Sequence, residues 1–145
     1  MSPLDRAVLA ERTAALQRHL ARVAARLPSR PEDLAPSSDS ADAVILHLWQ
    51  ATQIVIDLAV AACVAYNTGT PQGYGDAFRR LEAADIIDAA LADRLVRAAG
   101  FRNLVAHAYE QLDLRRVHQA ATDGPRDLLA FVAALAQRQG DSGRR

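Results

Sequence analysis

The chain has 145 residues, half of them apolar, so it is long enough to bury one hydrophobic core and leaves little room for a second domain. Seventeen basic residues balance seventeen acidic ones, which excludes a general positive field that attracts nucleic acid. Any contact with RNA must therefore be built locally. Cys63 is the single cysteine, so an internal disulfide is excluded, and its apolar neighbours indicate a core residue.

The apolar periodicity predicts about five helices and no strand, so the expected fold is an all-α antiparallel bundle. The first helix covers residues 4–27, and the proline- and serine-rich residues 28–40 form a loop. Asp39 or Ser40 is expected to cap the second helix, which covers residues 41–66. Because this helix is almost wholly apolar, we expect it at the centre of the bundle.

Three further helical segments follow in the second half of the chain. A turn-rich loop over residues 67–75 leads to a short helix, Asp76–Ala84, and Asp88 is expected to cap a fourth helix over residues 89–109. The last helical region starts after its own cap and runs to about residue 138.

The last helical region has two features that affect the domain boundaries. Asp113 is expected to cap it, and Gly124-Pro125 is expected to kink or split it, because proline removes a helical hydrogen bond. We expect a single helical domain over residues 1–139 and a frayed tail over residues 140–145.

The sequence predicts a cytoplasmic protein with no membrane association. It begins with a charged helical pattern rather than an apolar signal core. Its most apolar stretch, residues 54–66, is interrupted by Asp57 and is too short to span a bilayer.

Polar residues gather on one side of the second helix. His47, Gln50, Gln53 and Asp57 fall within an arc of about 120° when the helix is projected at 100° per residue. This arc is either the floor of a site or interface, or a solvent-exposed edge, and the pattern leaves both alternatives open.

The segment R-N-L-V-A-H-A-Y, near the end of the fourth helix, carries residue types suited to RNA cleavage without a metal. That chemistry requires proton transfer, which histidine performs near neutral pH, and a cation that stabilises phosphate charge, for which arginine is suited. His107 shares an exposed helical face with Asn103 and Glu110, whereas Arg102 and Tyr109 share a neighbouring face. Glu110 either lines a cleft or is simply solvated. A polar helix surface without function can show the same spacing.

The residues around this segment resemble a known family. Gly100–Tyr109 resembles the R-N-x-x-x-H-x-Y signature of HepT toxins in the HEPN superfamily. Residues 41–59 resemble the family's second helix with its I-D-x-A element, and residues 74–87 resemble the segment that leads into the motif helix. Together with L-D-L at residues 112–114, the resemblance covers roughly residues 40–120.

The resemblance implies a homodimeric helical bundle with metal-independent ribonuclease activity and no cofactor. It implies that Arg102 and His107 form the catalytic pair and that Asn103 is the polar residue that follows the arginine. It also implies a partner, a minimal nucleotidyltransferase (MNT) antitoxin that adds AMP to Tyr109. Asp57 matches the family's acidic residue on the second helix. It either lines the cleft and positions the arginine or is an ordinary hydrogen-bond partner.

Two other functions remain open at this point. The chain can be a non-catalytic HEPN module that docks with a nucleotidyltransferase and is modified by it. It can also be a purely structural dimerisation bundle, in which loss of the motif residues has no effect.

Overall fold

The computed structural model describes residues 4–143, which form five α-helices, two short 3-10 helices and no strand. The α-helices are α1 (Arg6–Arg26), α2 (Asp39–Ala65), α3 (Tyr74–Ala83), α4 (Ala89–Ala108) and α5 (Leu114–Gly143), and the 3-10 helices are η1 (Pro31–Asp33) and η2 (Tyr109–Gln111). The prediction of an all-α bundle of about five helices is confirmed.

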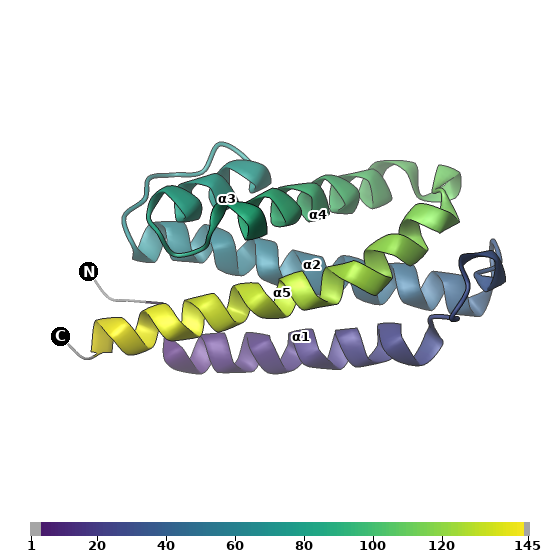
Figure 1. The fold of residues 1–145 in the computed structure, drawn as a ribbon, viewed down its shortest axis with the longest axis horizontal. Coiled ribbons are helices and arrows are strands. Elements are labelled where there is room, and N and C mark those ends of the chain that lie inside the picture. The colour runs from purple at the N-terminus through teal and green to yellow at the C-terminus, as the bar shows by residue number, and fades with distance from the viewer. Residues whose placement is uncertain (1–3, 144–145) are drawn as a thin grey trace.

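Helix α2 is the central element, as predicted. It contacts each of the other four α-helices, and Figure 1 shows α1 on one side of it and α3 and α4 on the other. By length and composition alone α2 is apolar enough to cross a membrane, but 56% of its most apolar window is buried inside the bundle. The apolar character of α2 is thus explained by its position in the core.

The helix starts follow local capping. Asp88 caps α4 and Asp113 caps the start of α5, and in each case the carboxylate accepts a backbone N–H as predicted. The prediction for α2 was wrong by one residue, because Ser38 rather than Asp39 or Ser40 is the cap. The extended backbone of Ser38 lets its hydroxyl oxygen accept the backbone N–H three residues later, at 3.1 Å.

Helix α5 is continuous from Leu114 to Gly143, with Pro125 inside it. The predicted split at Gly124-Pro125 does not occur, and Figure 1 shows one ribbon that curves along its length. Proline removes only one hydrogen bond of the helix, and the buried side chains of Val117 and Leu128 anchor the helix on both sides of it.

The C-terminal tail also differs from expectation. Residues 140–143 belong to α5, so the predicted frayed tail is wrong for these residues. Residues 144–145 of that tail, and residues 1–3 of the predicted domain, lie outside the described residues.

The buried apolar side chains form two clusters along α2. The larger one includes Phe78 of α3 and Phe131 of α5, whose rings meet edge to face with centroids 5.6 Å apart. The smaller one joins the first half of α2 to Val105 of α4 and Val117 of α5. The end of α4, which carries the motif, therefore packs over the smaller cluster.

Replacing Gly124 with alanine is expected to stabilise the fold by about 0.5–1 kcal/mol, because glycine is unfavourable inside a helix. A Cβ atom at this position meets no other atom within 4 Å. Chemical denaturation with circular dichroism measures the free energy of unfolding. As a contrast, Gly69→Ala is expected to destabilise, since Gly69 has a φ of +96° and its added Cβ lies 2.5 Å from Arg80 Nη1. A lower free energy of unfolding for Gly124→Ala than for the wild type would contradict a regular α-helical conformation at this position.

Candidate active site

The side chain of Arg102 is held against α2 by neutral groups. Its Nε donates a hydrogen bond to Gln53 Oε1 at 2.7 Å, and its Nη1 donates to Asn103 Oδ1 at 3.1 Å. Its Cζ lies 5.1 Å from the centroid of the Trp49 ring and 5.4 Å from that of Tyr74. Aromatic faces attract a cation without neutralising it, so these contacts fix the guanidinium and preserve its charge.

A carboxylate contributes to the position of Arg102 only indirectly, through the amide of Gln53. Asp57 Oδ1 accepts a hydrogen bond from Gln53 Nε2 at 2.8 Å. Because a carboxylate can only accept, it takes the amide N–H and leaves the amide oxygen of Gln53 for Arg102. None of the ion pairs among residues 4–143 includes Arg102. The Asp57–Gln53–Arg102 relay thus orients a guanidinium that no carboxylate neutralises.

The imidazole of His107 is exposed on α4, as predicted. It lies five residues after Arg102, about 7 Å further along the helix axis. Asn103, also exposed, lies on the same helix between them. No hydrogen bond or ion pair among residues 4–143 involves the His107 side chain, so it is free to meet a ligand.

The predicted face of Asn103, His107 and Glu110 does not extend to Glu110. Helix α4 ends at Ala108, whose φ of −140° and ψ of 38° break the helical geometry. Glu110 therefore lies in η2, and no hydrogen bond or ion pair within residues 4–143 joins it to His107. Glu110 is thus outside α4, and its two alternatives, a cleft-lining side chain and a solvated one, both stay predictions.

The side chain of Tyr109 is also redirected by the end of α4. It is the first residue of η2, and its hydroxyl donates a hydrogen bond to Asp42 Oδ1 at 2.6 Å. That hydrogen bond, then burial, then the charge of Asp42 raise the pKa of Tyr109 to about 12. Asp42 precedes Trp49 by about 10 Å along α2. Arg102 and Tyr109 both face α2, as their shared face predicts, but Arg102 contacts Trp49 and Gln53, which lie about two and three helical turns after Asp42.

The other three histidines have protein partners. His19 Nδ1 of α1 lies 3.0 Å from His47 Nδ1 of α2, and burial, above all, lowers the pKa of both imidazoles. His118 is buried, with its Nε2 2.7 Å from the carbonyl oxygen of Pro28. Within residues 4–143, only His107 lacks such a partner.

The polar arc on α2 is divided between two surroundings. Gln53 and Asp57 belong to the Arg102 arrangement, whereas His47 faces α1. Sequence reasoning assigned no role to Trp49 or Tyr74, although the rings of both residues lie within contact distance of the Arg102 guanidinium and help to orient it. Trp49 could have been noticed as the single tryptophan of the chain, next in sequence to Gln50 of the polar arc. Tyr74 stood in a segment that was expected to be a loop.

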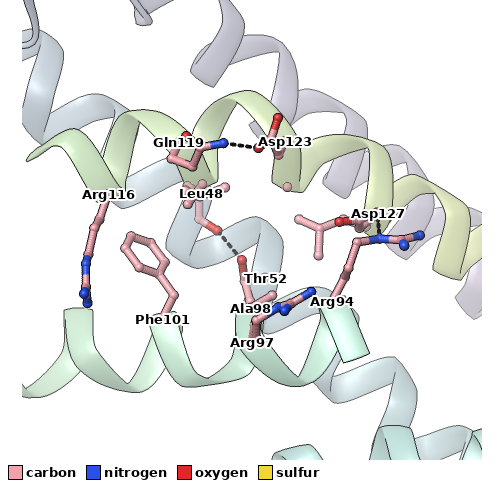
Figure 2. Close-up of a pocket in the computed structure, with 13 residues that line it drawn as sticks. Leu48, Thr52, Arg94, Arg97, Ala98, Phe101, Arg116, Gln119, Asp123 and Asp127 are labelled. Atoms are coloured by element: carbon pink, nitrogen blue, oxygen red, sulfur yellow. Dashed lines mark hydrogen bonds and ion pairs between the residues drawn. The ribbon is translucent and has the colours of Figure 1, made fainter. Parts of the chain in front are cut away.

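A separate cavity of about 500 Å³ lies between α2, α4 and α5 (Figure 2). Phe101 and Arg97 reach it from α4 and Arg116 from α5, as Figure 2 shows. A further arginine at its rim, Arg94, pairs with Asp127 at 2.8 Å. None of the predicted site residues lines this cavity, so it is distinct from the Arg102 arrangement.

The residues described by the structure contain no group of three His, Cys, Asp or Glu side chains placed to hold a metal ion. Cys63 is buried in the larger cluster, and burial raises the pKa of its thiol. Its place in the core agrees with the prediction from its apolar neighbours.

Comparison with known proteins identifies relatives along most of the chain. The model of the family described as ribonuclease HepT-like matches residues 16–135. The mRNA nuclease HepT of Shewanella oneidensis is 34% identical over 94 residues, which cover 65% of this chain and 71% of the relative.

Solved structures show the same fold at low sequence identity. A tri-AMPylated HEPN toxin of Shewanella oneidensis, solved in complex with an MNT antitoxin, superposes with a TM-score of 0.81 at 23% identity, over 92% of this chain and 99% of the toxin. YutE, a cytosolic protein of unknown function from Bacillus subtilis, superposes with a TM-score of 0.83 at 13% identity, over 98% and 95% of the two chains.

The hydroxyl of Tyr109 is expected to resist ionisation in alkaline solution. Its pKa is raised to about 12 in the folded chain, against about 10 for a free tyrosine, so the folded state retains a proton that the unfolded state loses. The contribution of the protonated Tyr109 to the stability of the folded state is complete below about pH 10 and disappears as the pH rises towards 12. An absorbance titration of the wild type minus that of Tyr109→Phe isolates this residue. Ionisation of Tyr109 near pH 10 in the folded protein would contradict the hydrogen bond with Asp42.

Proposed function

Since the chain belongs to the ribonuclease HepT-like family, we propose that it is the toxin of a toxin–antitoxin system and acts as a metal-independent endoribonuclease. The observation that carries this proposal is Arg102, which is oriented by Gln53 and two aromatic rings, is not neutralised by a carboxylate, and shares a helix with the exposed His107. A fixed cation beside a free imidazole is the combination that RNA cleavage requires.

The proposed reaction uses the 2′-hydroxyl of the RNA as the nucleophile. His107 takes its proton while the 2′-oxygen attacks the phosphorus, and Arg102 stabilises the charge that builds on the phosphoryl oxygens. The bond from phosphorus to the 5′-oxygen breaks, and the leaving 5′-oxygen takes a proton from the protonated imidazole of the second copy in the dimer proposed below, which leaves a 2′,3′-cyclic phosphate and a 5′-hydroxyl. Asn103, which accepts a hydrogen bond from Arg102, helps to set the position of the guanidinium. The reaction draws on no cofactor.

We infer that the active form is a homodimer. Leu46 of α2 and Leu104 of α4 are 50% and 41% exposed, and both lie beside the candidate site. Leu46 shares its face of α2 with Asp42 and Gln53, at helical spacings of four and seven residues. Large apolar side chains exposed next to a site favour a contact with another protein surface. Contact between two copies here brings two histidines together, one for each proton transfer.

The proposed partner is an MNT-type nucleotidyltransferase antitoxin that adds AMP to Tyr109. The related toxin was solved tri-AMPylated and in complex with such an antitoxin. Tyr109 occupies the tyrosine position of the motif and is 45% exposed, so a second protein can reach it. An adenylate adds negative charge and bulk on the face of α2 that also holds Arg102. Because the two side chains contact α2 about two to three turns apart, several adenylates reach further towards Arg102 than one.

We place the protein in the cytoplasm, away from membranes. The support for this proposal is the burial of α2, the only described helix apolar enough to span a bilayer, and the fold shared with a cytosolic protein.

Loss of the catalytic pair is expected to abolish RNA cleavage. His107→Ala removes the base and Arg102→Lys removes the planar fork, so each is expected to slow cleavage by about 10²–10⁴-fold and to relieve growth arrest. Gln53→Ala, which frees the guanidinium, is expected to have a smaller effect in the same direction. Cleavage of labelled RNA by the purified protein, with EDTA present, measures the rate and the independence from metal.

The exposed residues Gln111 and Arg115 provide matched controls outside the site. Gln111→Ala and Arg115→Lys are expected to cleave at the wild-type rate. Full activity of His107→Ala, or loss of wild-type activity in EDTA, would overturn the proposed chemistry. Absence of cleavage by the wild type, together with modification by the antitoxin, would favour the non-catalytic module.

Modification of Tyr109 is testable separately. Incubation with the antitoxin, ATP and Mg²⁺ is expected to raise the mass of the chain by whole adenylate units and to stop RNA cleavage. Tyr109→Phe is expected to show no mass increase and to remain toxic when the antitoxin is present. Tyr74→Phe, a tyrosine of the same site with a different contact, is expected to be modified normally. Modification that persists in Tyr109→Phe assigns the target to another residue.

A further inference from the structure

The contact between Tyr109 and Asp42 joins the proposed modification site to a carboxylate that forms no ion pair with any described residue. The hydroxyl oxygen lies 2.6 Å from Asp42 Oδ1, a short separation typical of a hydrogen bond from a hydroxyl to a charged carboxylate. None of the ion pairs among residues 4–143 includes Asp42. The carboxylate is thus free to accept the proton that it already shares.

A tyrosine hydroxyl must lose its proton to act as a nucleophile. The hydrogen bond that raises the pKa of Tyr109 to about 12 makes the free phenolate rarer near neutral pH than it is for an ordinary tyrosine. A base that removes the proton while the new bond forms is the standard solution for a weak nucleophile.

We propose that Asp42 is the general base for adenylate transfer to Tyr109, an inference that rests on the proposed modification of that tyrosine. In this step the Tyr109 oxygen attacks the α-phosphorus of a nucleoside triphosphate, ATP. The new oxygen–phosphorus bond forms, the bond from the α-phosphorus to the bridging oxygen breaks, and pyrophosphate leaves. The phenolic proton moves to Asp42 Oδ1 and then to solvent. The toxin thereby supplies part of the chemistry of its own inactivation.

The geometry leaves room for this reaction. Tyr109 is 45% exposed, so the α-phosphate can approach the hydroxyl from solvent while the hydroxyl keeps its hydrogen bond with the carboxylate on α2. Asp42 lies in the first turn of α2, whose position is fixed by burial of neighbouring residues in the smaller cluster. Tyr109 and Asp42 are 67 residues apart in the sequence, so their hydrogen bond depends on the packing of the fold and not on local chain geometry.

The decisive variant is Asp42→Asn, which keeps an oxygen that can accept the tyrosine hydroxyl and removes the base. Its adenylate transfer rate, measured by mass spectrometry with limiting antitoxin, varied toxin and saturating ATP and Mg²⁺, is expected to fall about 100-fold. The loss is expected in kcat rather than in KM for the toxin. The rate of the variant is expected to rise with pH, as the tyrosine ionises unaided. Asp42→Glu is expected to recover part of the wild-type rate.

Asp39→Asn is the matched control, because Asp39 is an exposed aspartate in the same first turn of α2. It removes the same charge from the same helix end and is expected to be modified at the wild-type rate. Thermal melting of both variants compares their folding. A wild-type rate in Asp42→Asn, or a loss confined to KM, overturns the inference and assigns the base to the antitoxin. Absence of any modification in the wild type overturns the proposed function instead.

Discussion

Burial of α2 is the constraint on which the candidate site depends. This helix is apolar over most of its 27 residues and contacts all four other α-helices, so its polar side chains are confined to part of its circumference, one strip of which faces α4. Asp42, Trp49, Gln53 and Asp57 lie on that strip, within about 80° of one another on the helix. The end of α4 packs along it, and every contact that orients Arg102 or Tyr109 from α2 comes from these four residues.

The start and the middle of this strip have opposite electrostatic characters. Near its middle, a neutral amide and an aromatic face hold Arg102, which suits the binding of an anion. Near its start, the carboxylate of Asp42 holds the hydroxyl of Tyr109, which suits removal of a proton. Since both lie on one rigid helix, the separation between the anion site and the tyrosine is set by the helical rise and not by a flexible loop.

Much of the fold could be predicted from the sequence, because its signals are local. Helix periodicity and the caps at Asp88 and Asp113 depend on residues close together in the chain, and these predictions are confirmed. The continuity of α5 was not predictable from Pro125 alone, since burial on both sides of the proline outweighs one lost hydrogen bond.

A helical projection could predict the directions of the site residues only as far as the end of α4 at Ala108. It placed His107 on the surface, and it placed Gln53 and Asp57 on one polar arc. Only the family resemblance connected Asp57 with Arg102, as one of two alternatives, and nothing in the sequence connected Gln53 with that arginine. Beyond Ala108 the projection no longer applies to Glu110, and it placed Tyr109 too close to Arg102, because no glycine or proline marks the change to 3-10 geometry. Asp42, 67 positions away in sequence, was visible only through tertiary packing.

The amide of Gln53 has a consequence for how tightly an anion can bind. It is oriented by its hydrogen bond to Asp57 and in turn orients Arg102, while it keeps the carboxylate out of direct contact with the guanidinium. With a carboxylate in its place, an incoming phosphate would have to compete with an ion pair already formed. One neutral side chain thus gives the arginine a fixed direction and leaves its positive field open to a ligand from solvent.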